Sequence, residues 1–408
     1  MRICIIGGGL TGLTAAYHLG NDHEVDMYEK RRFLGGCLSS YEIGDYHIEE
    51  FYHHCFAWDT RLFSLMRSLH IADKLEWLRG TSGYFSGGTV YPLNTPVEIV
   101  KYPLLSLTDK VRLGLLTLRS RNMDVGPLDD ITARDYVVST IGERAYNSFF
   151  EPLLTSKFGE QRDDVSAAWL ISRIGVRSNR GLSGEQLGYL KGGFHTLIEA
   201  LSAQVGRQCV VRLLDPVTSV SREHGSWSVN GQQYDVVIST IPPSLLPGTG
   251  LAEGFSIPYQ GAACMLLSME KEVTSGIYWL NMKERAPYGA VIAHTNFVPV
   301  ERYGEHLVYL ASYFQGSVAQ NLDRVMIDDF CHRFHVDPGA IRWHRMAVDP
   351  YAGPLYTVGF RKYILPYQQN GLFLAGMFSS PNYPERSMNG AVIAGEEVAD
   401  LVSRRASD

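Results

Sequence analysis

The chain has 408 residues, and its 43 acidic side chains against 37 lysines and arginines give a formal net charge of −6. This balance lacks the basic excess that phosphate neutralisation requires, so we expect no nucleic-acid partner. The length is enough for two or three domains, and no apolar run reaches the 18 or so residues that cross a bilayer. We therefore predict no integral membrane segment.

The six cysteines show neither the CxxC pairing of zinc and redox sites nor the density of a disulfide scaffold. We expect reduced thiols and no metal site. The first residues are too few and too rich in glycine for the apolar core of a signal peptide, so a cytoplasmic location is expected.

The first predicted element is a strand over residues 3–6, an apolar run typical of a parallel sheet. A GxGxxG turn and a helix follow it directly. In this motif the glycines allow a tight turn, approach of backbone to a pyrophosphate, and close packing of helix on strand, while the helix start offers amides to the phosphates. The candidate phosphate-binding residues are Gly7, Gly9, Leu10, Thr11 and Gly12.

A second strand over residues 25–28 ends at Glu29, twenty residues after Gly9. A carboxylate there accepts hydrogen bonds from a ribose diol, and the neighbouring Lys30 joins the candidate site. Arg31 and Arg32 are alternative partners for a 2′-phosphate, but Glu29 would repel that group. We interpret them as solvated or pyrophosphate-side charges and predict a dinucleotide with a free 2′-hydroxyl.

The run from residue 3 to 16, Glu29 and the sequence Leu34-Gly35-Gly36 together resemble the N-terminal signature of the FAD-dependent amine oxidase, protoporphyrinogen oxidase and phytoene desaturase superfamily. UDP-galactopyranose mutase is also similar. The second glycine pair implies FAD rather than NAD and adds Gly35 and Gly36 to the site. Relatives commonly carry arginine where this chain has Cys37, so Arg31 or Arg32 would have to replace that pyrophosphate contact.

Apolar residues at positions 58, 62, 65, 66 and 69 predict a core-packing helix. The polar and aromatic stretch 49–54 precedes it. The resemblance places this stretch near the flavin ring, and its likeness to the mutase segment makes His53 and His54 catalytic candidates. The alternative is that both are surface or satisfied core histidines.

A second domain is predicted from residue 80, where turn residues break the pattern into short strands. Ser106 and Thr132 each precede an aspartate by three residues, so helices should begin there. The first of these helices carries basic residues around leucines. We interpret it as a solvated face over a packed core, the alternative being peripheral contact with an anionic membrane.

The stretch 151–159 resembles a segment that lines the substrate side in the protoporphyrinogen oxidase-like branch. Lys157 is therefore a candidate site residue, because amine oxidases often hold a lysine through a water to the flavin. Lys191 and Lys283 remain alternatives for that role.

The chain then returns to the first domain through a double glycine at 192–193, a helix to about 205, and strands over 210–214 and 235–240. The resemblance adds Val217 near the adenine and Thr240 at the edge of the flavin domain. Strand-length apolar segments at 262–268, 277–281, 290–294 and 307–313 predict an antiparallel sheet in the substrate domain.

The last signal is a buried strand over 372–376 and a helix that opens at Ser387 and runs to about 402. In relatives this region closes the flavin site, and a helix N-terminus stabilises an anion. The resemblance implies that Gly376, Met388, Asn389, Gly390 and Ala391 bind the flavin. No cysteine follows Cys331, so non-covalent FAD is expected.

These patterns predict an α/β protein with a Rossmann-like FAD-binding domain and a discontinuous α+β substrate domain with an antiparallel or mixed sheet. The FAD-binding domain comprises 1–79, 187–255 and 340–408, and the substrate domain 80–186 and 256–339. The expected function is an FAD-dependent oxidoreductase that removes a hydride equivalent from a CH–NH, CH–CH or CH–OH unit of a small molecule. The alternatives are a sugar-nucleotide mutase without net redox and a non-enzymatic FAD module.

Overall fold

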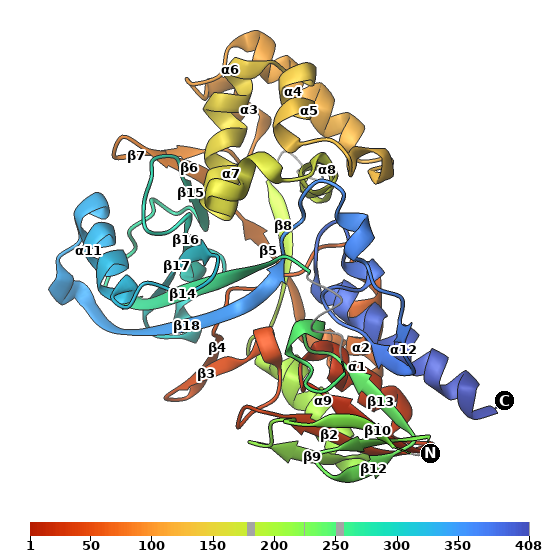
Figure 1. Cartoon of the computed structure of the whole chain (residues 1–408). Helices are drawn as coiled ribbons and strands as arrows, with labels where there is room; N and C mark the ends of the chain where they lie inside the picture. The colour runs from red at the N-terminus through yellow and green to blue at the C-terminus, as the bar shows by residue number, and fades with distance from the viewer. Residues whose placement is uncertain (178–183, 224, 250–256, 408) are drawn as a thin grey trace. The chain divides into compact units, whose positions relative to one another are not determined.

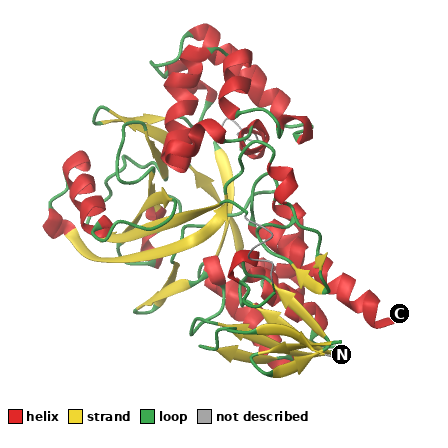
Figure 2. Ribbon diagram, in the orientation of Figure 1, coloured by secondary structure: helices red, strands yellow, loops and turns green. Residues whose placement is uncertain are grey.

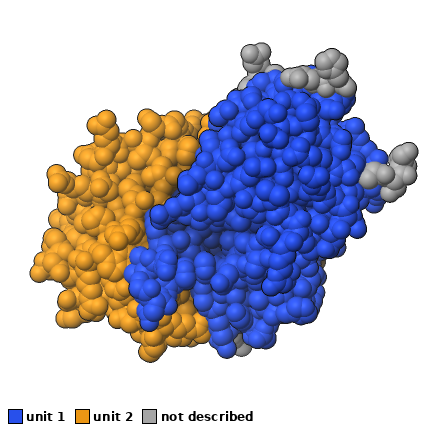
Figure 3. Space-filling view, turned by 90° about the horizontal axis from the view of Figure 1, so that it is seen from below, with its two compact units in different colours: residues 1–76, 189–258, 361–408 blue, residues 77–188, 259–360 orange. Residues whose placement is uncertain are grey.

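The computed structural model describes residues 1–177, 184–223, 225–249 and 257–407. The chain divides into two compact units, coloured separately in Figure 3. Unit 1 comprises Met1–Glu76, Tyr189–Pro258 and Arg361–Asp408, and unit 2 comprises Trp77–Gly188 and Tyr259–Phe360. The chain passes between the units within β5 (Leu75–Gly80) and β8 (Glu185–Leu190).

Unit 1 is built on a six-stranded sheet in the order β19-β20-β13-β1-β2-β9. Every neighbouring pair is parallel except the short β19, which is antiparallel to β20. The strands are β1 (Arg2–Ile6), β2 (Glu24–Glu29), β9 (Val210–Leu213), β13 (Val236–Ser239), β19 (Gln368–Gln369) and β20 (Leu372–Leu374). Because β1 and β13 are buried almost throughout, the sheet needs cover on both faces.

Four helices of unit 1 supply much of that cover: α1 (Leu10–Leu19), α2 (Thr60–Ser68), α9 (His195–Gln208) and α12 (Met388–Ser407). Helix α12 packs along α1, as Figure 1 shows. Two further small sheets complete the unit: the hairpin of β3 (Ser40–Ile43) and β4 (Tyr46–Glu49), and the meander of β10 (Val220–Glu223), β11 (Ser226–Val229) and β12 (Gln232–Tyr234). The predicted helix around 58–69 is α2, although Trp58 lies outside it and is exposed.

Unit 2 contains a seven-stranded mixed sheet in the order β18-β14-β17-β16-β15-β6-β7. Every neighbouring pair is antiparallel except β15 with β6. The strands are β6 (Ser82–Ser86), β7 (Thr89–Pro92), β14 (Tyr259–Met269), β15 (Trp279–Met282), β16 (Ala290–Ala293), β17 (His306–Phe314) and β18 (Ile341–Pro354). Helix α11 (Leu322–Phe334) places Met326 and Phe330 in the apolar core of this sheet.

The other helices of unit 2 gather at one end of it, at the top of Figures 1 and 2. They are α3 (Pro96–Lys101), α4 (Leu107–Ser120), α5 (Ala133–Thr140), α6 (Glu143–Ala145), α7 (Glu151–Phe158) and α8 (Ala167–Val176). The predicted helix starts are confirmed: the side chains of Ser106 and Thr132 accept hydrogen bonds from the amides of Asp109 and Asp135.

The α/β class and the mixed second sheet agree with the prediction, but one division of the chain differs. The sequence predicts residues 340–360 in the FAD-binding domain, whereas β18 pairs along most of β14 in the sheet of unit 2. Its polar and aromatic sequence lacks the apolar run that marks the other strands, because β18 lies at the sheet edge. Among the described residues, no helix combines the length and apolar character that crossing a bilayer requires.

Candidate functional site

The turn after β1 is held by contacts between backbone atoms. The Gly7 amide donates to Tyr28 O at 2.9 Å, which ties the turn to the end of β2. Gly7 has φ +104°, a conformation that glycine adopts readily. A Cβ at Gly12 would collide with Gly7 O, so the third glycine is required for the close approach of α1 to the strand.

The second glycine pair lies against this turn. The Gly35 amide donates to Gly8 O at 2.8 Å, and Gly9 and Gly35 form a parallel bridge. A Cβ at Gly36 would lie 3.1 Å from Gly9 Cα, and Gly36 has φ +58°. The two glycine segments, well separated in the sequence, therefore form one backbone-lined surface that few other residues permit.

The start of α1 has no side-chain cap. Its N-cap is Gly9, and its first turn contains no acidic residue. The first amide to find a helical acceptor is that of Leu13, which donates to Gly9 O at 2.9 Å. Among the described residues, the Thr11 amide donates to no protein acceptor and is left for a ligand. A helix start of this kind combines unpaired donors with a partial positive charge, which favours phosphate.

Glu29 lies beside this open start, at the end of β2. Its side chain is buried, and its two carboxylate oxygens accept the amides of Gly8 and Arg31, each at 2.8 Å. These bonds fix the carboxylate while each oxygen retains a further lone pair. The residue is therefore orientated before any ligand arrives.

The contacts of Arg31 differ from those that the sequence predicts for it, which are with solvent or with the pyrophosphate. Its guanidinium forms a two-pronged ion pair with the buried Glu50, at 2.7 and 2.8 Å. The same guanidinium lies 4.1 Å from the centre of the Phe33 ring. No local pattern indicates this pair, because the two residues lie 19 positions apart and meet only in the folded chain.

Three other predicted residues follow strands or turns at this edge of the sheet. The Asp215 amide donates to Glu29 O at 3.1 Å, which brings the loop containing Val217 to the end of β2. Lys30 is exposed directly after that strand, and the half-buried Cys37 forms the centre of a short 3₁₀ turn after Gly36. Lys30 and the loop of Val217 follow the carboxyl ends of the parallel strands β2 and β9, where ligands bind in sheets of this type.

Thr240 supports the turn from within the protein. Its amide donates to Ile6 O at 2.9 Å, and its hydroxyl lies 3.0 and 3.1 Å from the carbonyl oxygens of Ile6 and Gly7. A Cβ at Gly376 would lie 3.2 Å from Thr240 O, so the ends of β13 and β20 also approach closely. Thr240 thus positions the first glycine of the motif.

The start of α12 is capped only in part. Ser387 Oγ accepts the Gly390 amide at 2.9 Å, and Ser387 O accepts the Ala391 amide at 3.0 Å. Asn382 holds this turn near Gly376, since its side chain donates to Gly376 O and accepts the Ser387 amide. Within the described part of the chain, the amides of Met388 and Asn389 donate to no protein acceptor. They are the open donors of this helix start.

The Asn389 side chain has a separate role that the sequence does not predict. Its oxygen accepts the amides of Arg61 and Leu62 at 2.9 and 3.1 Å, so it caps the start of α2. The side-chain oxygen of Asn389 is thus committed to α2, while its backbone amide stays open at the start of α12. The sequence holds no local signal for this cap, because Asn389 and Arg61 are 328 positions apart.

A buried acid, Glu49, is also absent from the residues that the sequence predicts for the site. It accepts the Tyr189 hydroxyl at 2.7 Å and the Phe194 amide at 2.6 Å. Burial raises the pKa of this carboxyl, and the two hydrogen bonds oppose that rise. A Cβ at Gly193 would lie 2.8 Å from Glu49 Oε1, which explains the double glycine before α9.

His53 packs near the same group, with its ring edge-to-face against Phe194 at 6.4 Å. Its Nδ1 lies 2.6 Å from Phe51 O. Because a carbonyl oxygen only accepts, Nδ1 carries the proton and Nε2 has a lone pair. Burial and the Arg386 charge lower the pKa of His53 to about 4, so it is neutral at neutral pH. His54 is half-buried and packs edge-to-face with Phe56.

Lys157 lies in unit 2, near the end of α7. Its ammonium nitrogen is 4.7 Å from the centre of the Trp169 ring, and its carbonyl oxygen accepts the Gln260 side chain at 2.5 Å. The alternative Lys191 belongs to unit 1 and is exposed, with an ion pair of 3.9 Å to Glu76. Lys157 is thus the better packed of these two lysines.

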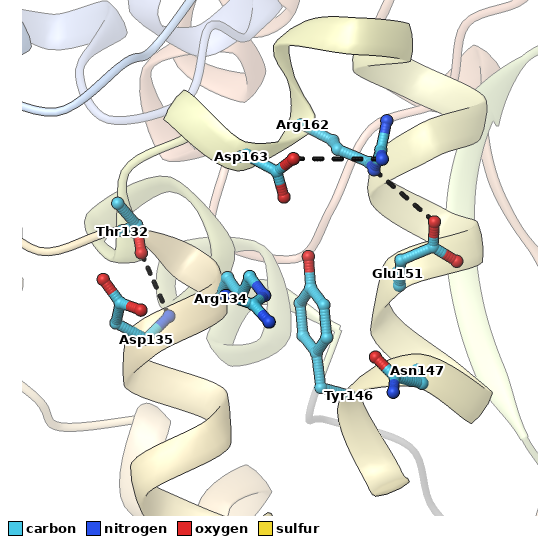
Figure 4. Close-up of a pocket in the computed structure, with 8 residues that line it drawn as sticks. All are labelled: Thr132, Arg134, Asp135, Tyr146, Asn147, Glu151, Arg162 and Asp163. Atoms are coloured by element: carbon cyan, nitrogen blue, oxygen red, sulfur yellow. Dashed lines mark hydrogen bonds and ion pairs between the residues drawn. The ribbon is translucent and has the colours of Figure 1, made fainter. Parts of the chain in front are cut away.

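Unit 2 also contains an open polar hollow of about 630 Å³ beside a π-helical turn, Tyr146–Phe150. Figure 4 shows the Tyr146 hydroxyl pointing between the side chains of Arg134 and Arg162. Arg162 forms ion pairs with Glu151 and Asp163 at 3.5 and 3.8 Å. Burial and the two carboxylates raise the pKa of Tyr146 to about 12, so its phenol remains protonated.

Acidic, histidine and cysteine side chains are the candidate metal ligands among the described residues. In the parts of the chain that the structure covers, no three of them lie close enough together to hold one. None of the six cysteines, all of which the structure describes, forms a disulfide bond.

Comparison with known proteins identifies the family to which this chain belongs. Residues 10–403 match the family of flavin containing amine oxidoreductases, and the chain belongs to that family. The match covers almost the whole chain, including the second glycine pair and the start of α12. The protein is accordingly a flavoprotein and an oxidoreductase of the amine oxidase type.

Individual relatives are more distant. The zeta-carotene desaturase of Synechocystis is 37% identical over 198 residues, which cover 42% of this chain and 40% of that protein. A structure from Exiguobacterium, provisionally named protoporphyrinogen oxidase, has a TM-score of 0.78 at 20% identity and 99% coverage of both chains. Reduced UDP-galactopyranose mutase has a TM-score of 0.74 at 17% identity, with 100% of this chain and 96% of that chain covered. The two structures share the fold.

Proposed function

We propose that the protein binds FAD non-covalently in unit 1 and uses it to remove a hydride equivalent from a CH–NH, CH–CH or CH–OH unit of a small organic substrate. The observation that supports this most strongly is the uncapped start of α1, which lies against the second glycine pair. A Cβ at Gly9 would meet no atom nearer than Gly36 Cα at 3.9 Å, so the backbone there is open to a ligand.

Several of the predicted residues have a role toward the cofactor in this proposal. The amides of Gly9, Leu10, Thr11 and Gly12 would bind the pyrophosphate, together with the positive end of α1. Glu29 would accept the ribose hydroxyls, and the loop at Val217 would lie along the adenine. The open amides of Met388 and Asn389 would stabilise negative charge at the flavin end of the site. When bound, the flavin supplies the acceptor for the hydride equivalent.

Among the three bond types we favour CH–CH. The preference for a CH–CH bond is supported by the similarity to zeta-carotene desaturases. The Synechocystis desaturase is 37% identical to this chain over the matched region. The matched region covers only 40% of that desaturase. A carotene-like substrate is therefore part of our proposal and is not established by the match.

The candidate catalytic residues are His53, His54 and Lys157. His53 is the one whose protonation is best defined, because its Nδ1 is fixed by Phe51 O and its low pKa keeps Nε2 as a lone-pair acceptor. We assign Nε2 the task of accepting a hydrogen bond at neutral pH. Its lowered pKa makes the ring a weaker base than a histidine with the ordinary pKa of about 6.5.

The competing function is a sugar-nucleotide mutase without net redox. The fold similarity to UDP-galactopyranose mutase fits both functions, so the flavin spectrum must separate them. Anaerobic addition of a polyene or an amine should bleach the flavin in proportion to substrate if the protein is a dehydrogenase. Conversion of a sugar nucleotide only after chemical reduction of the flavin would instead establish the mutase.

FAD binding itself is tested by Glu29→Gln, which keeps one acceptor oxygen but removes the charge. Loss of one charge-assisted hydrogen bond is worth about 1.5–3 kcal/mol, so FAD should bind at least about tenfold more weakly. Glu24→Gln is the control, because Glu24 is an exposed residue at the start of the same strand. Fluorescence titration of FAD measures both. Equal affinity in both variants, or protein without a flavin spectrum after reconstitution, contradicts the proposal.

A further inference from the structure

Helix α4 has apolar residues on two opposite sides. At about 100° per residue, Leu113 and Leu116 lie on the side that is buried against the rest of unit 2. A second set, Leu107, Val111, Leu115 and Leu118, falls within an arc of about 80° on the other side. One apolar side accounts for packing, and the second has no such role.

The second set is exposed to solvent. Leu107 is 71% exposed, Leu118 62%, Val111 57% and Leu115 49%. Val97, Val100 and Leu104, on α3 and the turn before α4, are exposed as well. Seven of the eighteen large apolar side chains that are exposed in the described structure thus lie between residues 97 and 118. Such a concentration marks an interaction surface rather than chance exposure.

Basic residues border the exposed apolar arc on both sides. Arg112 and Arg119 lie along one border, and Lys110 and Arg121 along the other. Asp109, the single acidic residue in the sequence of α4, is buried and accepts hydrogen bonds from Ser106 and Arg144. The exposed surface of α4 is therefore apolar in the centre and cationic at its edges.

We infer that this surface, formed by residues 97–121, docks on the headgroup region of a membrane that contains anionic lipids. A helix with an apolar stripe between cationic borders lies in the plane of such a membrane and buries its stripe at the boundary of headgroups and acyl chains. The charges select the partner: a protein interface would not require cations along both borders, whereas each lysine or arginine near an anionic leaflet contributes about 1 kcal/mol. The sequence of α4 favours a solvated face over a packed core. That interpretation explains the buried Leu113 and Leu116 but not the exposed apolar residues on the other side of the helix.

The size of the surface fits a helix that lies on the membrane. The stripe from Leu107 to Leu118 is about 16 Å long at about 1.5 Å per residue. This is about half the thickness of a bilayer core, and no described helix meets the requirements for crossing one. The leucines therefore anchor the protein peripherally.

The test is co-sedimentation of the FAD-reconstituted protein with vesicles. Phosphatidylcholine vesicles with and without phosphatidylglycerol measure the contribution of charge. We expect binding to the mixed vesicles, weaker binding to phosphatidylcholine alone, and loss of binding as salt is raised. The double variant Leu107→Gln/Leu118→Gln should bind about tenfold more weakly for each leucine removed.

Matched variants exclude unfolding as the cause. Val325 and Val348 are exposed apolar residues elsewhere in unit 2, so Val325→Gln/Val348→Gln should bind vesicles like the parent chain. Arg119→Gln, at an exposed arginine, should lose about fivefold on mixed vesicles and little on phosphatidylcholine. Flavin absorbance and the unfolding midpoint should stay the same in all of them.

Three results would overturn the inference. The first is no binding of the parent chain to mixed vesicles. The second is equal loss of binding in the leucine and valine double variants. The third is a parent chain that forms a dimer without lipid and becomes monomeric in the leucine variant while binding no vesicles, which would make the stripe an interface between two copies.

Discussion

Helices α1 and α4 each have one part without a partner in the protein: the start of α1 and one side of α4. α1 is buried along most of its length, but among the described residues no side chain caps its start. α4 has a complete capping box of Ser106 and Asp109, but one side of it is apolar and exposed. An unsatisfied end provides donors and positive charge for a phosphate, whereas an unsatisfied side provides area for an apolar surface. The part of a helix that lacks a partner therefore indicates the kind of ligand it binds.

The starts of α2 and α12 are intermediate, because each has some of its first amides satisfied by a capping residue. α12 has two of its first amides satisfied through Ser387, and α2 receives its cap from Asn389 of α12. Substitutions at these helices distinguish the contacts that are structural from those that are left for a ligand.

The largest effect is expected at the glycine of α1. Gly12→Ala should lower the free energy of unfolding by about 3 kcal/mol, because the new Cβ would overlap Gly7 O and the backbone must move. A Cβ at Gly114 in α4 would meet no atom within 4 Å. Gly114→Ala should therefore raise stability by about 0.5–1 kcal/mol through helix propensity. Urea unfolding measures both, and similar changes in the two variants would show that the start of α1 is not tightly packed.

The next largest change in the free energy of unfolding is expected at Asp59, and it depends on pH. Asp59 precedes α2 and accepts the Phe56 amide at 2.8 Å, and burial raises its pKa to about 6. Its unfolded pKa is about 3.9, so the unfolded state loses its proton first and folding stability falls as the pH rises from about 4 to above 6. Asp59→Asn should therefore add about 2 kcal/mol at a pH of about 7.5 and little at a pH of about 4, measured by urea unfolding at both values. A gain of equal size at both pH values would contradict a buried carboxylate as the cause.

The smallest effect concerns the cap that α2 receives from α12. Asn389→Ala removes the acceptor of the Arg61 and Leu62 amides, so stability should fall by about 1 kcal/mol. The backbone donors of α12 remain, and FAD affinity should change by less than about twofold. Thermal unfolding and FAD titration measure the two quantities. A large loss of FAD affinity with unchanged stability would assign the Asn389 side chain to the cofactor instead.

The features that could be predicted from the sequence are local in the chain. The glycine turn, the caps at Ser106 and Thr132, and the strand before Glu29 each depend on residues within a few positions of one another. Backbone conformation and hydrogen bonding over such short ranges follow from residue type. The fold class followed from the order of these signals.

The features that could not be predicted depend on distant partners. Glu49 meets Tyr189, Arg31 meets Glu50, and Asn389 caps a helix near the other end of the chain. The edge strand β18 is polar because one of its sides lacks a neighbouring strand. In α4 the periodicity revealed apolar positions, but it could not show which of two opposite apolar sides is buried.

The contact between α1 and α12 joins the first and last helices of the described structure. Gly395 of α12 lies so close to α1 that an added Cβ would stand 2.7 Å from Thr11 O and from Thr14 Cβ. A nascent chain that has not yet emerged as far as α12 therefore leaves this side of α1 uncovered. Because domains fold as units, unit 1 is completed only after α12 has been synthesised. Intermediates that expose α1 are the stage at which we expect this protein to need a chaperone.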